Sequence, residues 1–282
     1  MNSPIGIFDS GLGGLSVARQ VLELLPKESI VYFADNAHVP YGERPLDEIS
    51  KFAHQITRFL IDKGAKAVVM ACNMSSAVAL QSARERFGQI PILGVIEPGA
   101  KAAVDVSEGE PIGVLATTGT VKNGAYVRAI RRIDPERLVV QQACPEFVPL
   151  VESSQADSEK AKSAARTCVA PLVSAGCKTI ILGCTHYPFV RPAIESAAGV
   201  GVTIVDPAEE TALRLQNTLV KRRLASDGPQ LPHTFYASGE TTEFAALGSA
   251  FLGRRINSVE TAAWGVDLGA PEPNTEHLAL NT

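Results

Sequence analysis

Two cysteines with matching surroundings are the residues of this sequence best suited to chemistry. Cys72 lies in A-C-N-M-S-S-A and Cys184 in L-G-C-T-H-Y-P, and each follows a short apolar run. A thiol, with a free pKa of about 8.5, can both remove and deliver a proton near neutral pH. Two thiols on opposite sides of one carbon could therefore exchange its proton, provided that fixed donors stabilise the carbanion-like transition state. The pair predicts racemisation at an acidic C–H bond.

Each cysteine stands between a predicted strand and a predicted helix. We expect Asn73 or Ser75 to cap the first helix, Thr185 to cap the second, and Pro188 to lie at the start of the second. The positive end of a helix dipole favours a thiolate, so this location should lower the cysteine pKa. A lone cysteine at a strand end is more often a packing residue, and only the matched pair makes a functional interpretation strong.

The elements that would position these cysteines follow an alternating pattern. Runs rich in Val and Ile alternate with segments of helical periodicity, and this predicts a parallel sheet covered on both faces. In such sheets ligands bind at the carboxyl ends of the strands. The predicted strands are 5–8, 30–33, 67–70, 92–95, 112–115, 138–142, 179–182 and 202–205.

A weak internal repeat divides the chain into two halves. I-G-I-F-D-S-G from Ile5 aligns with I-G-V-L-A-T-T-G from Ile112, at about the interval that separates the two cysteines. Two half-sized sheets are therefore predicted, each with one cysteine just after an apolar strand. Periodicity does not assign the later helix 208–223, strand 234–237 and helix 242–251 to either half.

Composition narrows the class of partner. The 282 residues include 26 basic and 30 acidic side chains, without a block of like charge that would suggest a nucleic-acid or lipid-binding arm. The first residues do not form a signal peptide, and no apolar run approaches the length of about 18 residues that spans a bilayer. We expect a cytoplasmic protein with a small-molecule partner, and five free thiols because no C-x-x-C spacing occurs.

A dinucleotide-binding dehydrogenase is the strongest rival interpretation. Gly11, Gly13 and Gly14 follow a predicted strand, and Asp35 lies near the end of the next one. However, Ser16 occupies the position of the third glycine, and the acid of F-D-S-G would lie beside the pyrophosphate. The motif therefore does not support this function.

Metal and pyridoxal enzymes are also disfavoured. A zinc site built from the two cysteines and His186 would lack closely spaced ligand pairs and a fourth ligand. A pyridoxal enzyme needs a lysine in the crevice, and none of the strand-end candidates is a lysine. We expect neither a metal nor a cofactor.

Six segments together resemble a known family. F-D-S-G-L-G-G-L, V-P-Y-G, A-C-N, G-V-I-E-P-G, F-V-P-L-V-E and G-C-T-H-Y-P occur in the order seen in glutamate racemases of the aspartate/glutamate racemase superfamily, between residue 5 and about residue 259. This resemblance implies two pseudo-symmetric α/β lobes, each a mainly parallel sheet flanked by helices, with the active site in the cleft between them. The first lobe would comprise 1–97 plus 208–264 and the second 98–207. Residues 265–282 are rich in Gly, Pro, Asn and Glu without an apolar period, and this composition predicts a flexible tail.

The resemblance also implies the roles of single residues. Cys72 and Cys184 would be the catalytic acid/base pair, with Asp9 assisting Cys72, His186 assisting Cys184, and Glu152 as a further acid. Cys72 would serve D-glutamate and Cys184 L-glutamate, and the D-glutamate would supply peptidoglycan precursors. Because the family is often dimeric, a homodimer is left open. The expected substrate contacts are Asp9, Ser10, Tyr41, Gly42, Asn73, Met74, Ser75, Thr117, Thr120, Thr185 and His186.

Two positions depart from the family pattern. Met74 stands where a hydroxyl residue is usual, so one substrate hydrogen bond would have to come from Ser75 or the backbone. Pro207 stands where Ser is usual and is typical of the first position of a helix. Met74 leaves open a racemase of aspartate or another small amino acid, or a non-catalytic amino-acid-binding protein. Judged without the resemblance, Asp9 could be a helix cap and Glu152 a solvated surface acid.

Overall fold

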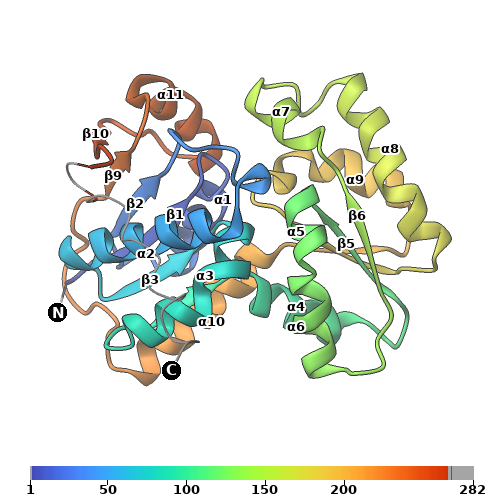
Figure 1. Ribbon diagram of the computed structural model, residues 1–282, viewed down its shortest axis with the longest axis horizontal. Helices are drawn as coiled ribbons and strands as arrows, with labels where there is room; N and C mark the ends of the chain where they lie inside the picture. Colours follow the sequence, from blue (N-terminus) through green and yellow to red (C-terminus); the bar gives the residue numbers. More distant parts are fainter. Residues whose placement is uncertain (1, 266–267, 269–282) are drawn as a thin grey trace, which may run out of the picture.

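The computed structural model describes residues 2–265 and 268, which form two α/β lobes side by side (Figure 1). The predicted fold of two parallel sheets flanked by helices is confirmed. The first sheet has the order β10-β9-β2-β1-β3-β4 and the second the order β6-β5-β7-β8, with every pair parallel. The strands are β1 Ile5–Asp9, β2 Ile30–Ala34, β3 Ala67–Met70, β4 Ile92–Gly94, β5 Ile112–Ala116, β6 Val139–Ala143, β7 Thr179–Gly183, β8 Thr203–Val205, β9 Thr234–Ala237 and β10 Glu260–Thr261.

Helices cover both faces of the first sheet. Successive side chains of a strand point to opposite faces, and apolar side chains on both faces of these buried strands must be covered. Ile5 and Ile7 of β1 join the core that includes α1, whereas Phe8 joins the core that includes α2 and α3. The helices are α1 Leu15–Leu24, α2 Leu46–Asp62, α3 Asn73–Arg86, α4 Ile96–Val106, α5 Thr118–Asn123, α6 Ala125–Ile133, α7 Phe147–Glu152, α8 Glu159–Ser174, α9 Arg191–Ala198, α10 Pro207–Lys221 and α11 Thr241–Leu252, with 3-10 turns η1 Tyr41–Glu43 and η2 Tyr187–Val190.

The internal repeat corresponds to a repeated topology. The order β2-β1-β3-β4 in the first lobe matches β6-β5-β7-β8 in the second, so the two aligned segments are the equivalent strands β1 and β5. The equivalent strands β3 and β7 pair with them, with Ile5 opposite Ala67 and Ile112 opposite Thr179. The cysteines follow β3 and β7 and therefore occupy equivalent places.

The last quarter of the chain returns to the first lobe. β9 pairs with β2, and β10 extends the sheet beyond β9. Helix α10, which begins at Pro207 as predicted, packs against α1 and α4. The residue boundaries proposed for the lobes remain predictions. The predicted tail 265–282 lies outside the described residues except for 265 and 268, and within the described part no helix is long and apolar enough to cross a membrane.

Candidate active site

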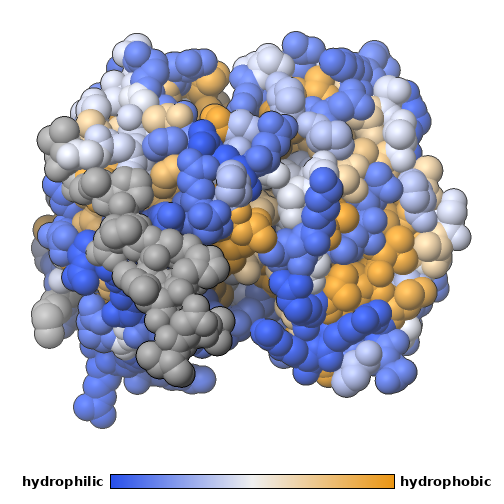
Figure 2. All heavy atoms as spheres, viewed as in Figure 1, coloured by the Kyte–Doolittle hydropathy of each residue, from blue (hydrophilic) through white to orange (hydrophobic). Residues whose placement is uncertain are grey.

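A pocket between the lobes contains both cysteines. The boundary between the lobes is a furrow in the space-filling view of Figure 2. The first lobe contributes the ends of β1 and β3 and the segment around η1, and the second contributes α5, α7 and the end of β7. The pocket is lined by Ser10, Val39, Pro40, Tyr41, Gly42, Cys72, Asn73, Met74, Thr117, Thr120, Val148, Gly183, Cys184, Thr185 and His186.

Cys72 lies immediately before α3 and is almost completely buried. Burial and the neighbouring negative charge of Asp9 raise the pKa of its thiol to about 12, although contacts with the first turn of α3 act in the opposite direction. The predicted lowering of this pKa is therefore wrong, because desolvation outweighs the helix end here. The thiol form of Cys72 is the stable one at neutral pH.

Asp9 ends β1 behind the pocket and is fully buried. Its Oδ2 accepts a hydrogen bond from the backbone N–H of Gly11 at 3.1 Å, so it does not cap α1. Its Oδ1 has no hydrogen-bond partner among the residues that the structure describes. Burial raises the pKa of Asp9, and the charge of His186 opposes this shift. A buried carboxyl with a free oxygen beside Cys72 can exchange a proton with the site.

Cys184 lies in a chain of polar contacts with His186 and Glu152. The His186 Nδ1 lies 3.9 Å from the Cys184 Sγ, and the His186 Nε2 lies 3.1 Å from Glu152 Oε1. Burial alone would lower the pKa of His186, but its hydrogen bonds to Cys184 and Glu152 outweigh this effect and raise the pKa to about 10. A protonated His186 can therefore donate to the sulfur and the carboxylate together.

Two glycines allow the turn after β1 to approach this group. A Cβ atom at Gly13 would lie 2.3 Å from Thr185 Oγ1 and 2.5 Å from His186 Nδ1. One at Gly14 would lie 2.4 Å from the Asp9 Cβ. Two of the three glycines that resembled a dinucleotide motif, Gly13 and Gly14, are thus explained by close packing around the catalytic candidates.

Hydrogen bonds hold residues of the pocket wall in place, and one of them joins the two lobes. The Tyr126 hydroxyl on α6 donates to Asn73 Oδ1 at 2.8 Å, and this bond crosses between the lobes. Thr117 caps α5 through the backbone N–H of Thr120. Tyr126 lacks a motif of its own and was not among the predicted site residues. Only its place in a helix after the repeated strand could have suggested it.

The wall beside Cys72 contains an apolar side chain. Met74 lines the pocket and is 4% exposed, whereas Ser75 is completely buried and lies outside the pocket lining. Within the described part of the chain, no side-chain bond caps α3 or η2, so the predicted caps Asn73, Ser75 and Thr185 are wrong. Pro188 does lie in the first turn of η2, as predicted.

The predicted residues fall into two groups. Most line the pocket, whereas Asp9, Ser75 and Glu152 lie outside its lining; of these, Asp9 and Glu152 act on residues within it. Among the described residues, no group of three or more His, Cys, Asp or Glu side chains is arranged to hold a metal ion.

Comparison with known proteins finds relatives that are similar to this chain in sequence and in fold. The family model for Asp/Glu/hydantoin racemase matches residues 5–215. The glutamate racemase of Desulforudis audaxviator is 44% identical over 90% of this chain and 96% of its own. The solved RacE1 glutamate racemase of Bacillus anthracis is 37% identical, with a TM-score of 0.88 over 92% of this chain and 97% of its own. A Francisella tularensis glutamate racemase, solved with D-glutamate, is 31% identical, with a TM-score of 0.87 over 93% and 98%. The chain therefore belongs to the Asp/Glu/hydantoin racemase family and, within it, to the glutamate racemases, which are isomerases.

Proposed function

We propose that this protein interconverts L- and D-glutamate without a cofactor, by proton transfer between Cys72 and Cys184. One observation carries the proposal: each lobe brings one thiol, from equivalent strand ends, to the same pocket. Two acid/base groups facing one carbon are what inversion of an α-carbon needs. The D-glutamate bound to the Francisella tularensis relative supports glutamate as the substrate.

The surroundings of the two thiols support a different role for each in the conversion of L-glutamate: Cys184 removes a proton and Cys72 delivers one. His186 can donate a hydrogen bond to the Cys184 sulfur, while Cys72 is held as a thiol. Acting as the base, Cys184 would take the α-proton of L-glutamate. Cys72 would then deliver its own proton to the opposite face and give D-glutamate, leaving Cys72 as thiolate and Cys184 as thiol.

The reverse reaction requires the opposite protonation state. Cys72 must then be the thiolate that removes the α-proton of D-glutamate, and Cys184 the thiol that delivers one. Asp9 can assist because its raised pKa and free Oδ1 allow it to take the proton of Cys72. His186, hydrogen-bonded to Glu152, is the corresponding assistant for Cys184.

Fixed polar groups around the pocket would stabilise the substrate and the charge that develops on its carboxylate. Ser10, Asn73 and Thr185 follow strand ends, and Thr117 and Thr120 lie at the start of α5. These groups are already oriented by the fold, so they need no reorganisation in the transition state. The hydroxyl missing at Met74 would be replaced by backbone donors at the start of α3, because Ser75 lies outside the pocket lining.

D-Glutamate made by this reaction would supply peptidoglycan precursors in the cytoplasm. The role is supported by the bacterial glutamate racemases to which the chain is similar over most of its length.

The function is tested by incubating the purified protein with L-glutamate and no added cofactor, and following circular dichroism. We expect the signal to decay to that of a racemate. Cys72→Ala and Cys184→Ala should each lower kcat by about a hundredfold or more, since each removes an acid/base group. Cys177→Ala, which removes a buried thiol between α8 and β7, is the control and should retain the activity.

Three results would contradict the proposal. A cysteine variant with activity close to that of the unmodified protein would exclude the two-thiol mechanism. Racemisation of aspartate in preference to glutamate would assign a different substrate, as Met74 allows. Binding of glutamate without any racemisation would identify a binding protein of the same fold.

A further inference from the structure

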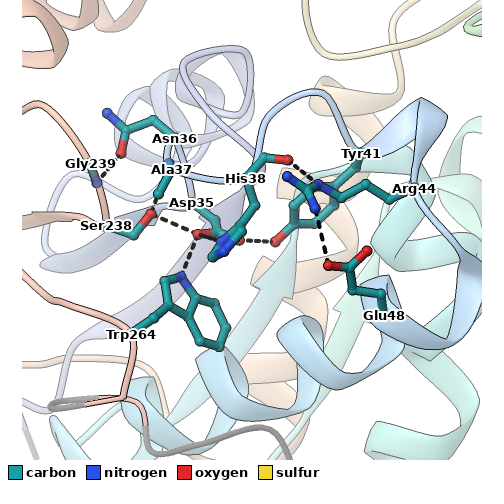
Figure 3. A network of polar contacts seen from close by, with 10 residues as sticks. All are labelled: Asp35, Asn36, Ala37, His38, Tyr41, Arg44, Glu48, Ser238, Gly239 and Trp264. Carbon is teal, nitrogen blue, oxygen red and sulfur yellow. Dashed lines mark hydrogen bonds and ion pairs between the residues drawn. The ribbon is translucent and has the colours of Figure 1, made fainter.

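A buried carboxylate outside the pocket collects side chains from three adjacent strands. Asp35 follows β2, Ser238 follows β9, and Trp264 lies three residues beyond β10. These strands are neighbours in a parallel sheet, so their carboxyl ends lie at one edge of it. Figure 3 shows the resulting network.

The carboxylate of Asp35 accepts four donors. Its Oδ1 accepts from the Ser238 hydroxyl at 2.7 Å, from Trp264 Nε1 at 2.8 Å and from His38 Nδ1 at 2.9 Å. Its Oδ2 accepts from the Tyr41 hydroxyl at 2.5 Å. Asp35 is fully buried, so each of these bonds replaces water that the carboxylate has lost.

One donor lies in a segment that forms one wall of the pocket, and another lies next to that segment. We call Val39–Gly42 the wall segment, because all four of its residues line the pocket. Tyr41 is part of the wall segment, and His38 immediately precedes it. The Tyr41 hydroxyl is directed to Asp35 (Figure 3), and burial raises its pKa far above the ordinary value, so it stays a donor. The bond thus connects Tyr41, a residue of the pocket wall, to Asp35.

The ring of Trp264 supports the same segment by packing. It lies 5.1 Å from the His38 ring and 4.8 Å from the Phe52 ring, and His38 stacks on Phe52 at 4.3 Å between centroids. Backbone pairing holds the segment that leads to Trp264, because the Ala262 N–H donates to the Ala237 carbonyl at 3.0 Å. The end of the described chain is thus connected to the pocket wall.

We propose that Asp35 is a positioning residue for substrate binding, and that Trp264 completes the anchor by which it holds the wall segment Val39–Gly42. The inference rests on the proposed function, since glutamate is the ligand whose binding it concerns. Neither side chain lines the pocket, so both act through the wall segment and do not touch the substrate.

Kinetics of Asp35→Asn and Trp264→Phe test this inference. Asparagine keeps the shape of Asp35 but cannot accept all four donors, and phenylalanine keeps the ring contacts of Trp264 but lacks its N–H donor. We expect the KM for glutamate to rise about tenfold or more in Asp35→Asn and by a smaller factor in Trp264→Phe, with kcat changed much less.

Fluorescence gives a readout that does not depend on activity. Trp264 is the only tryptophan of the chain, so its emission reports directly on the anchor. Without any substrate, Asp35→Asn should shift the emission to longer wavelength and increase its quenching by acrylamide. This measurement separates failure of the anchor from failure of the proposed function, which would abolish racemisation in the unmodified protein.

Glu28→Gln is the matched control. Glu28 forms a buried ion pair with Lys66 at 2.6 Å in the same lobe and lies outside the pocket lining. Glu28→Gln should lower the melting temperature and leave KM and the Trp264 emission unchanged. The inference is overturned if both anchor variants keep the KM of the unmodified protein, if Glu28→Gln raises KM equally, or if the emission of Asp35→Asn is unchanged. Should Asp35→Asn fail to fold, Trp264→Phe and Ser238→Ala decide the outcome through KM.

Discussion

The two cysteines occupy equivalent positions but have different neighbours. Cys72 lies beside a buried carboxylate, which together with burial raises its pKa to about 12. Cys184 lies beside His186, which carries a proton over the whole neutral range because its pKa is raised to about 10. A symmetric fold therefore holds an asymmetric pair of thiols. This asymmetry suits an enzyme in which one thiol begins each turnover as base and the other as acid.

The pH dependence of the reaction tests the role of Glu152. The raised pKa of His186 means that its protonated form persists above the ordinary value of 6.5 and is lost as the pH rises through about 10. Glu152→Gln weakens one of the bonds that hold this proton, so the alkaline loss of kcat/KM should move to lower pH. The ratio of kcat/KM at pH 9 to that at pH 7 measures this shift.

Glu159→Gln is the control for this prediction. Glu159 is the exposed first residue of α8, and its partner is Lys162. Its replacement should leave the alkaline limb in place. An alkaline limb that is the same in Glu152→Gln and in the unmodified protein would show that Glu152 does not support the proton on His186.

At the scale of elements, the turn between β1 and α1 brings the site together. Its glycines allow the backbone to approach Thr185 and His186 of the other lobe more closely than any side chain would permit. The Ser16 hydroxyl at the start of α1 donates to the Thr185 carbonyl at 3.2 Å. The turn is thus part of the contact between the lobes as well as the support of Asp9.

Gly13→Ala tests this close approach. The added Cβ would overlap Thr185 Oγ1 and His186 Nδ1, so His186 must shift and kcat should fall by about a hundredfold. Gly11→Ala in the same turn meets nothing closer than Val39 Cγ2 at 3.6 Å and should lose far less. Circular dichroism in the far ultraviolet checks that both variants fold. Equal kinetic losses in the two variants would show that the close approach of Gly13 to Thr185 and His186 is not what the turn contributes to catalysis.

The positions of most strands and pocket residues could be predicted from the sequence, whereas the burial and the charges around single side chains could not. Buried strands are continuous apolar runs, so β1, β3, β5 and β7 could be recognised, and the motifs indicated most of the pocket lining. The two-residue strand β10 is too short to produce a periodic signal. The wrong direction for the Cys72 pKa has a similar origin, because burial of the thiol and its proximity to Asp9 arise only from tertiary packing.

At the scale of the whole molecule, duplication creates the site. Neither lobe holds two thiols in the pocket, and the pocket forms only where equivalent strand ends of the two sheets meet (Figure 1). Direct hydrogen bonds cross this junction, including that from Tyr126 to Asn73. In the proposed reaction, the two lobes act on opposite faces of one carbon.

Deuterium labelling at early times distinguishes this two-sided reaction from proton exchange by a single base. L-Glutamate is incubated with the protein in deuterated water, and both enantiomers are analysed while conversion is still small. If Cys184 removes the proton and Cys72 delivers another from solvent, D-glutamate should carry α-deuterium while the remaining L-glutamate carries almost none. Deuterium that accumulates equally in the remaining L-glutamate, or protium retained in the D-glutamate formed, would indicate a single base and exclude proton transfer by two opposed thiols.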